Sequence, residues 1–274
     1  DGLLAATSRR VNRVVDGSVE WSVRTKQYID SIGVVGDRVV VLQQKDRERR
    51  KPGKITVMRD GTVEWERELS VGVAGGQARD GDSFVVTEGD GTVWRYDATG
   101  TLEWKTQLDS PCNTSPLVAH GGVFVVDTQD TAYRLDRATG ETTWTTAVAG
   151  ASRGTTPSIR ESNLLVGGTD QLYSLDATTG EQRWTFDTGR RPSTAEIGRR
   201  NCFVCSGAGD LSAVTLADGR ERWTATLPDR TVIRNGRGGT YAGINGQPIK
   251  IGRSVFVQTQ GGQLLTLSTQ GGRQ

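Results

Sequence analysis

Short runs of alternating apolar and polar residues recur along the chain, and turn residues bound each run. In "LYSLDATTGEQRWTFDTG", residues 172–189, one run ends at Asp176 and a second covers 183–186 after the sequence "DATTGE". This pattern predicts a β-hairpin. Asp176 can accept the backbone N–H two residues on, and Gly180 supplies the positive φ that closes the loop. We therefore interpret Asp-x-x-Thr-Gly as turn chemistry and not as a catalytic motif.

Tryptophans give this unit a period. The six register tryptophans are spaced 44, 39, 40, 40 and 39 residues apart; they are Trp21, Trp65, Trp104, Trp144, Trp184 and Trp223. Only Trp94 lies off this register. Two more short apolar runs precede each hairpin, so a period holds four strands, A to D, which is one blade of a β-propeller. The tryptophans are predicted to anchor neighbouring blades, because an aromatic ring buries about 150–250 Å².

The repeated segments "LDATTGEQRW", "LDRATGETTW" and "YDATGTLEW" carry a family resemblance. They resemble the tryptophan-docking repeat of PQQ-like (quinoprotein-type) β-propellers, which include BamB-like assembly lipoproteins. The resemblance covers essentially the whole chain, from about Gly2 to Thr269. It implies the fold strongly and the function weakly, because the repeat serves quinone enzymes, assembly scaffolds and receptor ectodomains, and function depends on the site that the fold carries.

The fold class is therefore predicted to be all-β, a propeller of four-stranded blades in one domain over residues 1–274. Complete blades are expected at 27–67, 72–107, 114–146, 155–186 and 193–225, and partial blades at 1–24 and 244–269. The first segment matches a blade from strand B onward and the last matches strands A to C, so the chain is expected to begin and end inside blades. Seven blades are predicted, and eight in a longer protein with missing segments is the alternative. The 36 glycines fit a fold rich in turns.

Residues for catalysis or metal binding are sparse. The single histidine, His120, lies in a predicted turn, and no triad or zinc site can be assembled around it. The resemblance to quinone dehydrogenases implies a longer chain with adjacent cysteines, whereas here Cys202 and Cys205 stand at i and i+3 on a predicted strand, hence on opposite faces. The acidic turns "ARDGDS" and "TEGDGT" lack the spacing of a calcium loop. We predict no catalytic residue, cofactor or metal.

Charge and hydropathy limit which partners and which cellular location the sequence is compatible with. The net charge of +2 gives no domain-wide basic footprint for nucleic acid. No apolar stretch is long enough for a transmembrane helix. Resemblance to secreted and periplasmic relatives favours an extracytoplasmic location, that is periplasmic, secreted or at the cell surface.

Two connections between predicted strands are longer than the others of their kind, and both carry cations. "QKDRERRKPGK" lengthens a B–C connection, and "LPDRTVIRNGRGGTY" lengthens a D–A connection. Antiparallel strands place B–C and D–A loops on the same face of a propeller, where "GRRPS" is also expected. The sequence thus predicts a basic crescent for partner binding, made of Arg47, Arg49, Arg50, Lys51, Lys54, Arg190, Arg191, Arg230, Arg234 and Arg237.

The predicted function is a non-enzymatic binding or assembly scaffold whose loop-rich face docks an acidic protein or polymer. Arginine favours this interpretation, because its planar guanidinium captures carboxylate or phosphate groups in a bidentate manner. Two alternatives stay open: a quinone-dependent dehydrogenase or sugar-processing enzyme, and the sensor ectodomain of a receptor or kinase.

Overall fold

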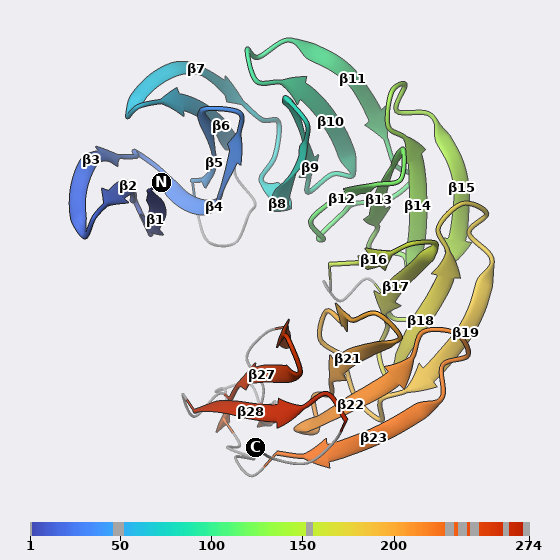
Figure 1. Ribbon diagram of the computed structural model, residues 1–274. Helices are drawn as coiled ribbons and strands as arrows, with labels where there is room; N and C mark the ends of the chain where they lie inside the picture. Colours follow the sequence, from blue (N-terminus) through green and yellow to red (C-terminus); the bar gives the residue numbers. More distant parts are fainter. Residues whose placement is uncertain are drawn as a thin grey trace. The chain divides into compact units, whose positions relative to one another are not determined.

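Antiparallel strands make up the fold, and no α-helix occurs among the residues that the structure describes. The structure is a computed structural model that describes residues 2–45, 52–151, 156–227, 233–234, 240–241, 247–259 and 263–270. Each sheet follows the chain as a meander, with consecutive strands hydrogen-bonded side by side (Figure 1). Short strands separated by glycine-rich turns produce this arrangement, because two-residue to five-residue loops join antiparallel neighbours.

Two compact units divide the chain. Unit 1 comprises Asp1–Gln129 and Leu135–Thr143, and unit 2 comprises Asp130–Arg134 and Trp144–Gln274. Among the described residues, seven sheets have three or four strands, and we number them in sequence order as blades 1 to 7. The all-β propeller fold predicted from the repeat is confirmed, and the sheets fit seven blades. The single domain spanning 1–274 stays a prediction.

The first three blades belong to unit 1. Blade 1 has three strands, β1 (Leu3–Thr7), β2 (Arg10–Val15) and β3 (Ser18–Arg24). Blade 2 has four, β4 (Tyr28–Val35), β5 (Arg38–Gln44), β6 (Gly53–Arg59) and β7 (Thr62–Glu68). Blade 3 also has four, β8 (Val73–Asp80), β9 (Ser83–Glu88), β10 (Thr92–Asp97) and β11 (Leu102–Gln107).

The remaining blades repeat this plan. Blade 4 has β12 (Leu117–Ala119), β13 (Gly122–Val126), β14 (Thr131–Asp136) and β15 (Thr142–Ala147). Blade 5 has β16 (Ser158–Arg160), β17 (Asn163–Gly167), β18 (Gln171–Asp176) and β19 (Gln182–Asp187). Blade 6 has β20 (Glu196–Ile197), β21 (Asn201–Cys205), β22 (Asp210–Thr215) and β23 (Glu221–Thr226). A separate pair, β24 (Ile233–Arg234) and β25 (Thr240–Tyr241), precedes blade 7, which has β26 (Ile249–Ile251), β27 (Ser254–Gln258) and β28 (Leu264–Ser268).

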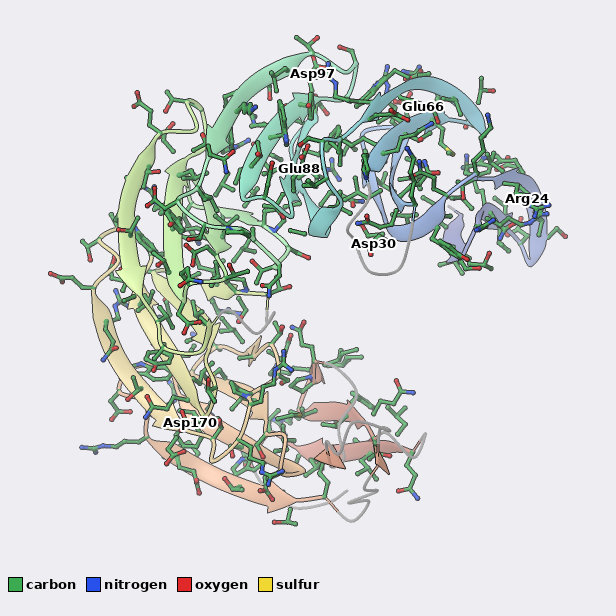
Figure 2. The ribbon with its side chains drawn as sticks, turned by 180° about the vertical axis from the view of Figure 1, so that it is seen from behind. Arg24, Asp30, Glu66, Glu88, Asp97 and Asp170 are labelled. Atoms are coloured by element: carbon green, nitrogen blue, oxygen red, sulfur yellow. The ribbon has the colours of Figure 1, made fainter. Side chains whose placement is uncertain are left out.

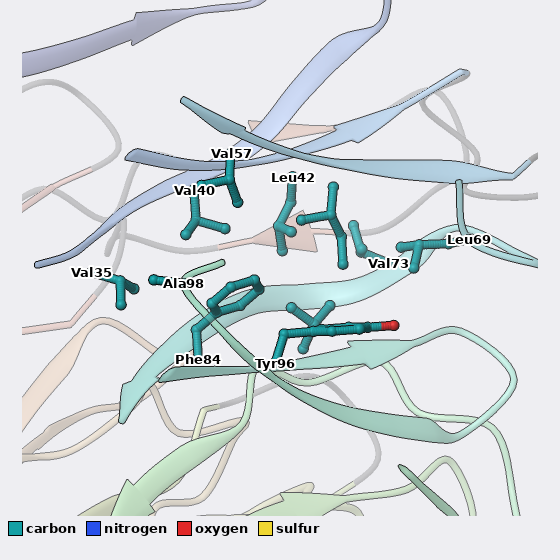
Figure 3. Close-up of a cluster of buried hydrophobic side chains, with 11 residues drawn as sticks. Val35, Val40, Leu42, Val57, Leu69, Val73, Phe84, Tyr96 and Ala98 are labelled. Atoms are coloured by element: carbon teal, nitrogen blue, oxygen red, sulfur yellow. The ribbon is translucent and has the colours of Figure 1, made fainter. Parts of the chain in front are cut away.

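The hydrophobic core lies between neighbouring blades. In unit 1, Val40 and Leu42 of blade 2 pack on Phe84 and Tyr96 of blade 3, and all four side chains are fully buried (Figure 3). In unit 2, a similar cluster joins blades 5 and 6, and another joins blades 6 and 7. The middle strands are apolar on both faces because each face of a central blade packs against a neighbouring blade.

The register tryptophans connect each blade to the next one. Trp184, at the middle of β19, is 7% exposed and donates its indole N–H to the carbonyl of Leu216 in blade 6, at 2.9 Å. Four others make the same bond: Trp65 to Ala98 at 3.1 Å, Trp104 to Arg137 at 2.9 Å, Trp144 to Ala177 at 3.2 Å and Trp223 to Thr269 at 3.2 Å. Trp21 differs, because its buried indole nitrogen has no hydrogen-bond partner among the described residues.

A turn glycine of the following blade lies against the indole ring. Gly219 has φ of +70°, and a Cβ at this position would come within 2.7 Å of Trp184. Only glycine satisfies both the left-handed backbone and this close approach. The repeated Gly therefore serves the blade contact as well as the turn, and the Asp of the same motif caps the turn: Asp176 accepts the backbone N–H of Thr178 at 2.7 Å.

Candidate partner-binding site

A polar groove lies between blades 1 and 2 in unit 1. Its volume is about 210 Å³, and its lining includes Arg24 at the end of β3, Lys26 in the connection to β4, and Lys54, Thr56 and Glu66 on β6 and β7. Arg24 and Glu66 are marked in Figure 2. Lys54 is the member of the predicted crescent that this groove contains.

A chain of hydrogen bonds organises the floor of the groove. Gln43 donates to the hydroxyl of Thr56 at 2.5 Å, and Thr56 donates to the carboxylate of Glu66 at 2.9 Å. Lys54 binds the other carboxylate oxygen of Glu66, also at 2.9 Å. Burial alone would raise the pKa of Glu66, but the hydrogen bonds from Lys54 and Thr56 and the charges of Lys54 and Lys26 lower it. Glu66 is thus held ionised, and Lys54 is neutralised within its own blade.

More cations gather where short turns meet at this end of the two blades. The N–H of Thr25 bonds to the carbonyl of Arg9 at 3.0 Å, which brings the β3–β4 connection beside the β1–β2 turn. The guanidinium of Arg9 lies 4.2 Å from the ring centre of Tyr28. Tyr28 pairs with Gln44, and Lys45 follows directly. We name this set the basic rim; it comprises Arg9, Arg10, Arg24, Lys26, Lys45 and Lys54.

Most cations of the basic rim form no ion pair with another described residue. Within the described part of the chain, no ion pair involves Arg9, Arg24, Lys26 or Lys45. Sequence reasoning missed Arg9, Arg10, Arg24 and Lys26 because it considered the two lengthened connections and "GRRPS" only, and it left out Lys45 although this residue lies in the first lengthened connection. The signal that would have found the first four is the positive charge of two short connections, "SRR" and "RTKQ".

The structure places only part of the predicted crescent. Arg47, Arg49, Arg50, Lys51, Arg230 and Arg237 lie outside the described residues. Arg234 belongs to β24, and Arg190 and Arg191 are exposed in the connection between β19 and β20. A crescent that unites Lys54 of unit 1 with the arginines of unit 2 stays a prediction.

All three cysteines are buried, and two of them belong to core clusters. Cys202 packs between blades 5 and 6, whereas Cys205 packs in the cluster shared with blade 7, so the two thiols face opposite sides of β21. Burial raises the pKa of each thiol to about 12, and it also raises the pKa of Cys112. Thiols of this kind are poor nucleophiles and poor metal ligands at neutral pH, because both roles require the thiolate.

The acidic side chains of the predicted turns have structural partners. Asp80 is buried and is engaged by Arg95 at 2.6 Å and by Arg137. Asp90 accepts the N–H of Thr92 at 3.0 Å within its own turn. No group of three or more His, Cys, Asp or Glu side chains in the described ranges is placed to hold a metal ion.

A second cavity, of about 550 Å³, lies in unit 1 between blades 2 and 3. It contains the off-register Trp94, whose indole N–H donates to the buried carboxylate of Glu88 at 3.0 Å, and Ser70 donates to the same carboxylate at 2.5 Å. Burial is the main reason why the pKa of Glu88 is raised, although the hydrogen bonds from Ser70 and Trp94 act against it. Lys105 covers the ring of Trp94 at 4.5 Å. Internal partners thus occupy the carboxylate of Glu88 and the indole N–H of Trp94.

These features define a β-propeller that carries the basic rim and buried, unreactive thiols. A family model described as outer membrane protein assembly factor BamB matches residues 51–163 and 133–274. The chain belongs to this family of PQQ-like β-propellers, because the two matches together span more than half of its length. Among the described residues, no helix has the length and apolar character needed to cross a membrane.

Solved structures with the same fold include a natural and a designed protein. BamB from Moraxella catarrhalis is 21% identical with a TM-score of 0.79, over 100% of this chain and 84% of that chain. The computationally designed Ika8 protein is 13% identical with a TM-score of 0.77, over 99% of this chain and 82% of that chain. At these identities the likeness shows the fold alone. Comparison with curated proteins found no match.

Proposed function

We propose that this chain is a non-enzymatic scaffold for protein assembly that docks an acidic segment of a partner protein on the basic rim. Membership of a family described as an outer membrane protein assembly factor supports the scaffold role. The same description supports an extracytoplasmic location, because outer membrane proteins are assembled outside the cytoplasm. The arginines of the insertion at 46–51 extend this proposal, since Lys45 leads directly into that segment.

The single observation that carries the acidic partner is the charge of the basic rim. Glu66, the carboxylate in the groove, is already bound to Lys54 and Thr56. Arg24 and Lys26 are exposed beside it. Exposed like charges repel one another, and an acidic segment relieves that repulsion when it binds. Charges at the edge of an interface act mainly on the association rate and on its salt dependence.

The partner is first captured in the native source with a photo-crosslinker placed at residue 26. Association with this partner is then measured for the wild type and for a variant in which Arg24 and Lys26 are both replaced by Glu. We expect the partner's cross-linked segment to be acidic, and the double variant to associate more slowly with a flatter salt response. Arg79→Glu is the matched control, because Arg79 is exposed at the far end of β8, beside the A–B turn. Equal rates for the wild type and the Arg24 and Lys26 double variant would contradict the proposal.

A further inference from the structure

A third cavity lies in unit 2, at the end of blade 6 where its A–B and C–D turns meet blade 7. Its volume is about 590 Å³, and its lining includes Arg200, Asn201, Thr215, Arg222, Trp223 and Thr269. The indole N–H of Trp223 is already bound to the carbonyl of Thr269, so the ring forms a wall of the cavity and offers no free donor. The remaining charged groups of this lining are the two arginines.

Blade 5 shows how the same place is filled when a carboxylate is present. Arg183, directly before the docking Trp184, forms an ion pair with Asp176. It also donates to the hydroxyl of Ser162 at 2.8 Å and to the amide oxygen of Asn163 at 2.9 Å. The guanidinium therefore has a complete set of partners within its own blade.

The strand register identifies the equivalent residues in blade 6. Asn163 pairs with Asp176 in blade 5, and Asn201 pairs with Thr215 in blade 6. The carbonyls of Ser162 and Arg200 accept matching backbone bonds, each at 2.9 Å, from Ala177 and Leu216. Arg183 and Arg222 each precede a docking tryptophan.

Two replacements follow from this register. Thr215 stands where blade 5 has Asp176, and Arg200 stands where blade 5 has Ser162. Compared with blade 5, blade 6 thus has the same arginine before the docking tryptophan, no carboxylate at the equivalent position, and a second arginine.

No residue of the described chain supplies the missing carboxylate to this pair. Arg200 and Arg222 are exposed, and neither has a side-chain hydrogen bond or ion pair with another described residue. The nearby Asp218 is bound to the hydroxyl of Thr215 and forms an ion pair with Arg220 at 3.3 Å. The turn thus satisfies its own acidic group and leaves both cavity arginines without an anion.

We infer that this cavity is a binding site for a carboxylate carried on another molecule, which takes the place that Asp176 occupies in blade 5. Two guanidinium groups around one cavity suit a carboxylate, because each presents parallel N–H donors that match two oxygens. The cavity is much larger than one carboxylate, and it therefore also admits the chain that carries the group. Both arginines belong to blade 6 in unit 2, so the site does not depend on the role of the basic rim.

The test measures binding by calorimetry at low ionic strength, where exposed charges are screened least. The probes are a hexaglutamate peptide, succinate and inorganic phosphate. All titrations use the Arg24→Glu, Lys26→Glu background as well as the wild type, because the basic rim is a second place where an acidic peptide can bind. A site in blade 6 is retained in that background, so failure of the scaffold proposal and failure of this one give different results.

Two variants remove the site by different routes. The double variant Arg200→Ser, Arg222→Gln removes both guanidinium groups, and we expect carboxylate binding to weaken roughly tenfold or more, because hydrogen bonds to charged groups are strong. Thr215→Asp restores the carboxylate of blade 5, and we expect this internal group to occupy Arg222 and displace the ligand. Arg220→Gln is the matched control, since it removes a nearby cation that does not line the cavity.

The outcomes show which kind of molecule carries the carboxylate. Binding of the peptide alone assigns the site to an acidic protein segment, and equal binding of succinate assigns it to a small dicarboxylate. The inference is overturned if neither carboxylate binds, if phosphate binds more tightly than both, or if both variants bind as the wild type does. Near-ultraviolet circular dichroism checks that each variant keeps its tryptophan packing.

Discussion

Trp184 provides the sharpest test of how the blades are held together. Its indole is 7% exposed, and it packs in the cluster between blades 5 and 6. Replacing a buried aromatic residue by alanine costs about 3–5 kcal/mol. The hydrogen bond to Leu216 contributes about 1 kcal/mol of stability in a typical case, and more if the carbonyl is left unpaired. We therefore expect Trp184→Ala to lower the free energy of unfolding by about 3–5 kcal/mol.

Trp184→Phe separates the two contributions. Phenylalanine keeps an aromatic ring in the cluster but has no N–H donor, so we expect a loss of about 1–2 kcal/mol. Trp21→Phe is the comparison variant, because the indole nitrogen of Trp21 has no hydrogen-bond partner in the described part of the chain and its loss should cost less.

Urea unfolding followed by far-ultraviolet circular dichroism gives these free energies, provided that the transition is two-state. Fluorescence is a poor probe here, since each variant removes a fluorophore. A loss below about 1 kcal/mol for Trp184→Ala, which is well under the cost of a core truncation, would refute the docking role. Equal losses for Trp184→Ala and Trp184→Phe would show that the ring contributes nothing beyond its hydrogen bond.

Two further predictions concern a buried carboxylate and a turn glycine. The raised pKa of Glu88 means that the folded state binds its proton more tightly than the unfolded state, so stability should fall as pH rises from about 4.5 through the folded pKa. Glu88→Gln imitates the protonated form and should remove this part of the pH dependence; an unchanged slope of unfolding free energy against pH would contradict the assignment. Gly180→Ala should cost more than the roughly 1–3 kcal/mol of a strained backbone, because its Cβ would come within 2.7 Å of Trp144. Gly189→Ala, with positive φ and nothing within 4 Å, gives the cost of strain alone, and equal melting temperatures would exclude the steric contribution.

Part of the blade 6 site is visible in the sequence once blades 5 and 6 are aligned. Arg222 and Arg183 occupy the same place before a docking tryptophan, and the change from Asp176 to Thr215 is visible once the repeats are aligned. Whether a guanidinium is neutralised depends on groups brought to it by neighbouring strands. The charge of the lengthened loops and of "GRRPS" therefore did not indicate the cavity in blade 6, and of the basic rim it indicated Lys54 alone.

The sequence by itself determined the repeat, the four-stranded blades, the docking tryptophans and the turns. These features are encoded locally: an Asp and a Gly a few residues apart set the turn, and the alternation beside them sets which faces are buried. Tertiary structure decided which cations meet at one edge and which carboxylates are already in use. Lys54 illustrates the difference, because its partner Glu66 lies on the next strand, 12 residues away. The register pairs Lys54 with Glu68 and Thr56 with Glu66, so the ion pair of Lys54 and Glu66 runs diagonally between the two strands. The sequence shows where the cations lie along the chain. Only the packing of the strands decides which of them have no acidic partner and can bind another molecule.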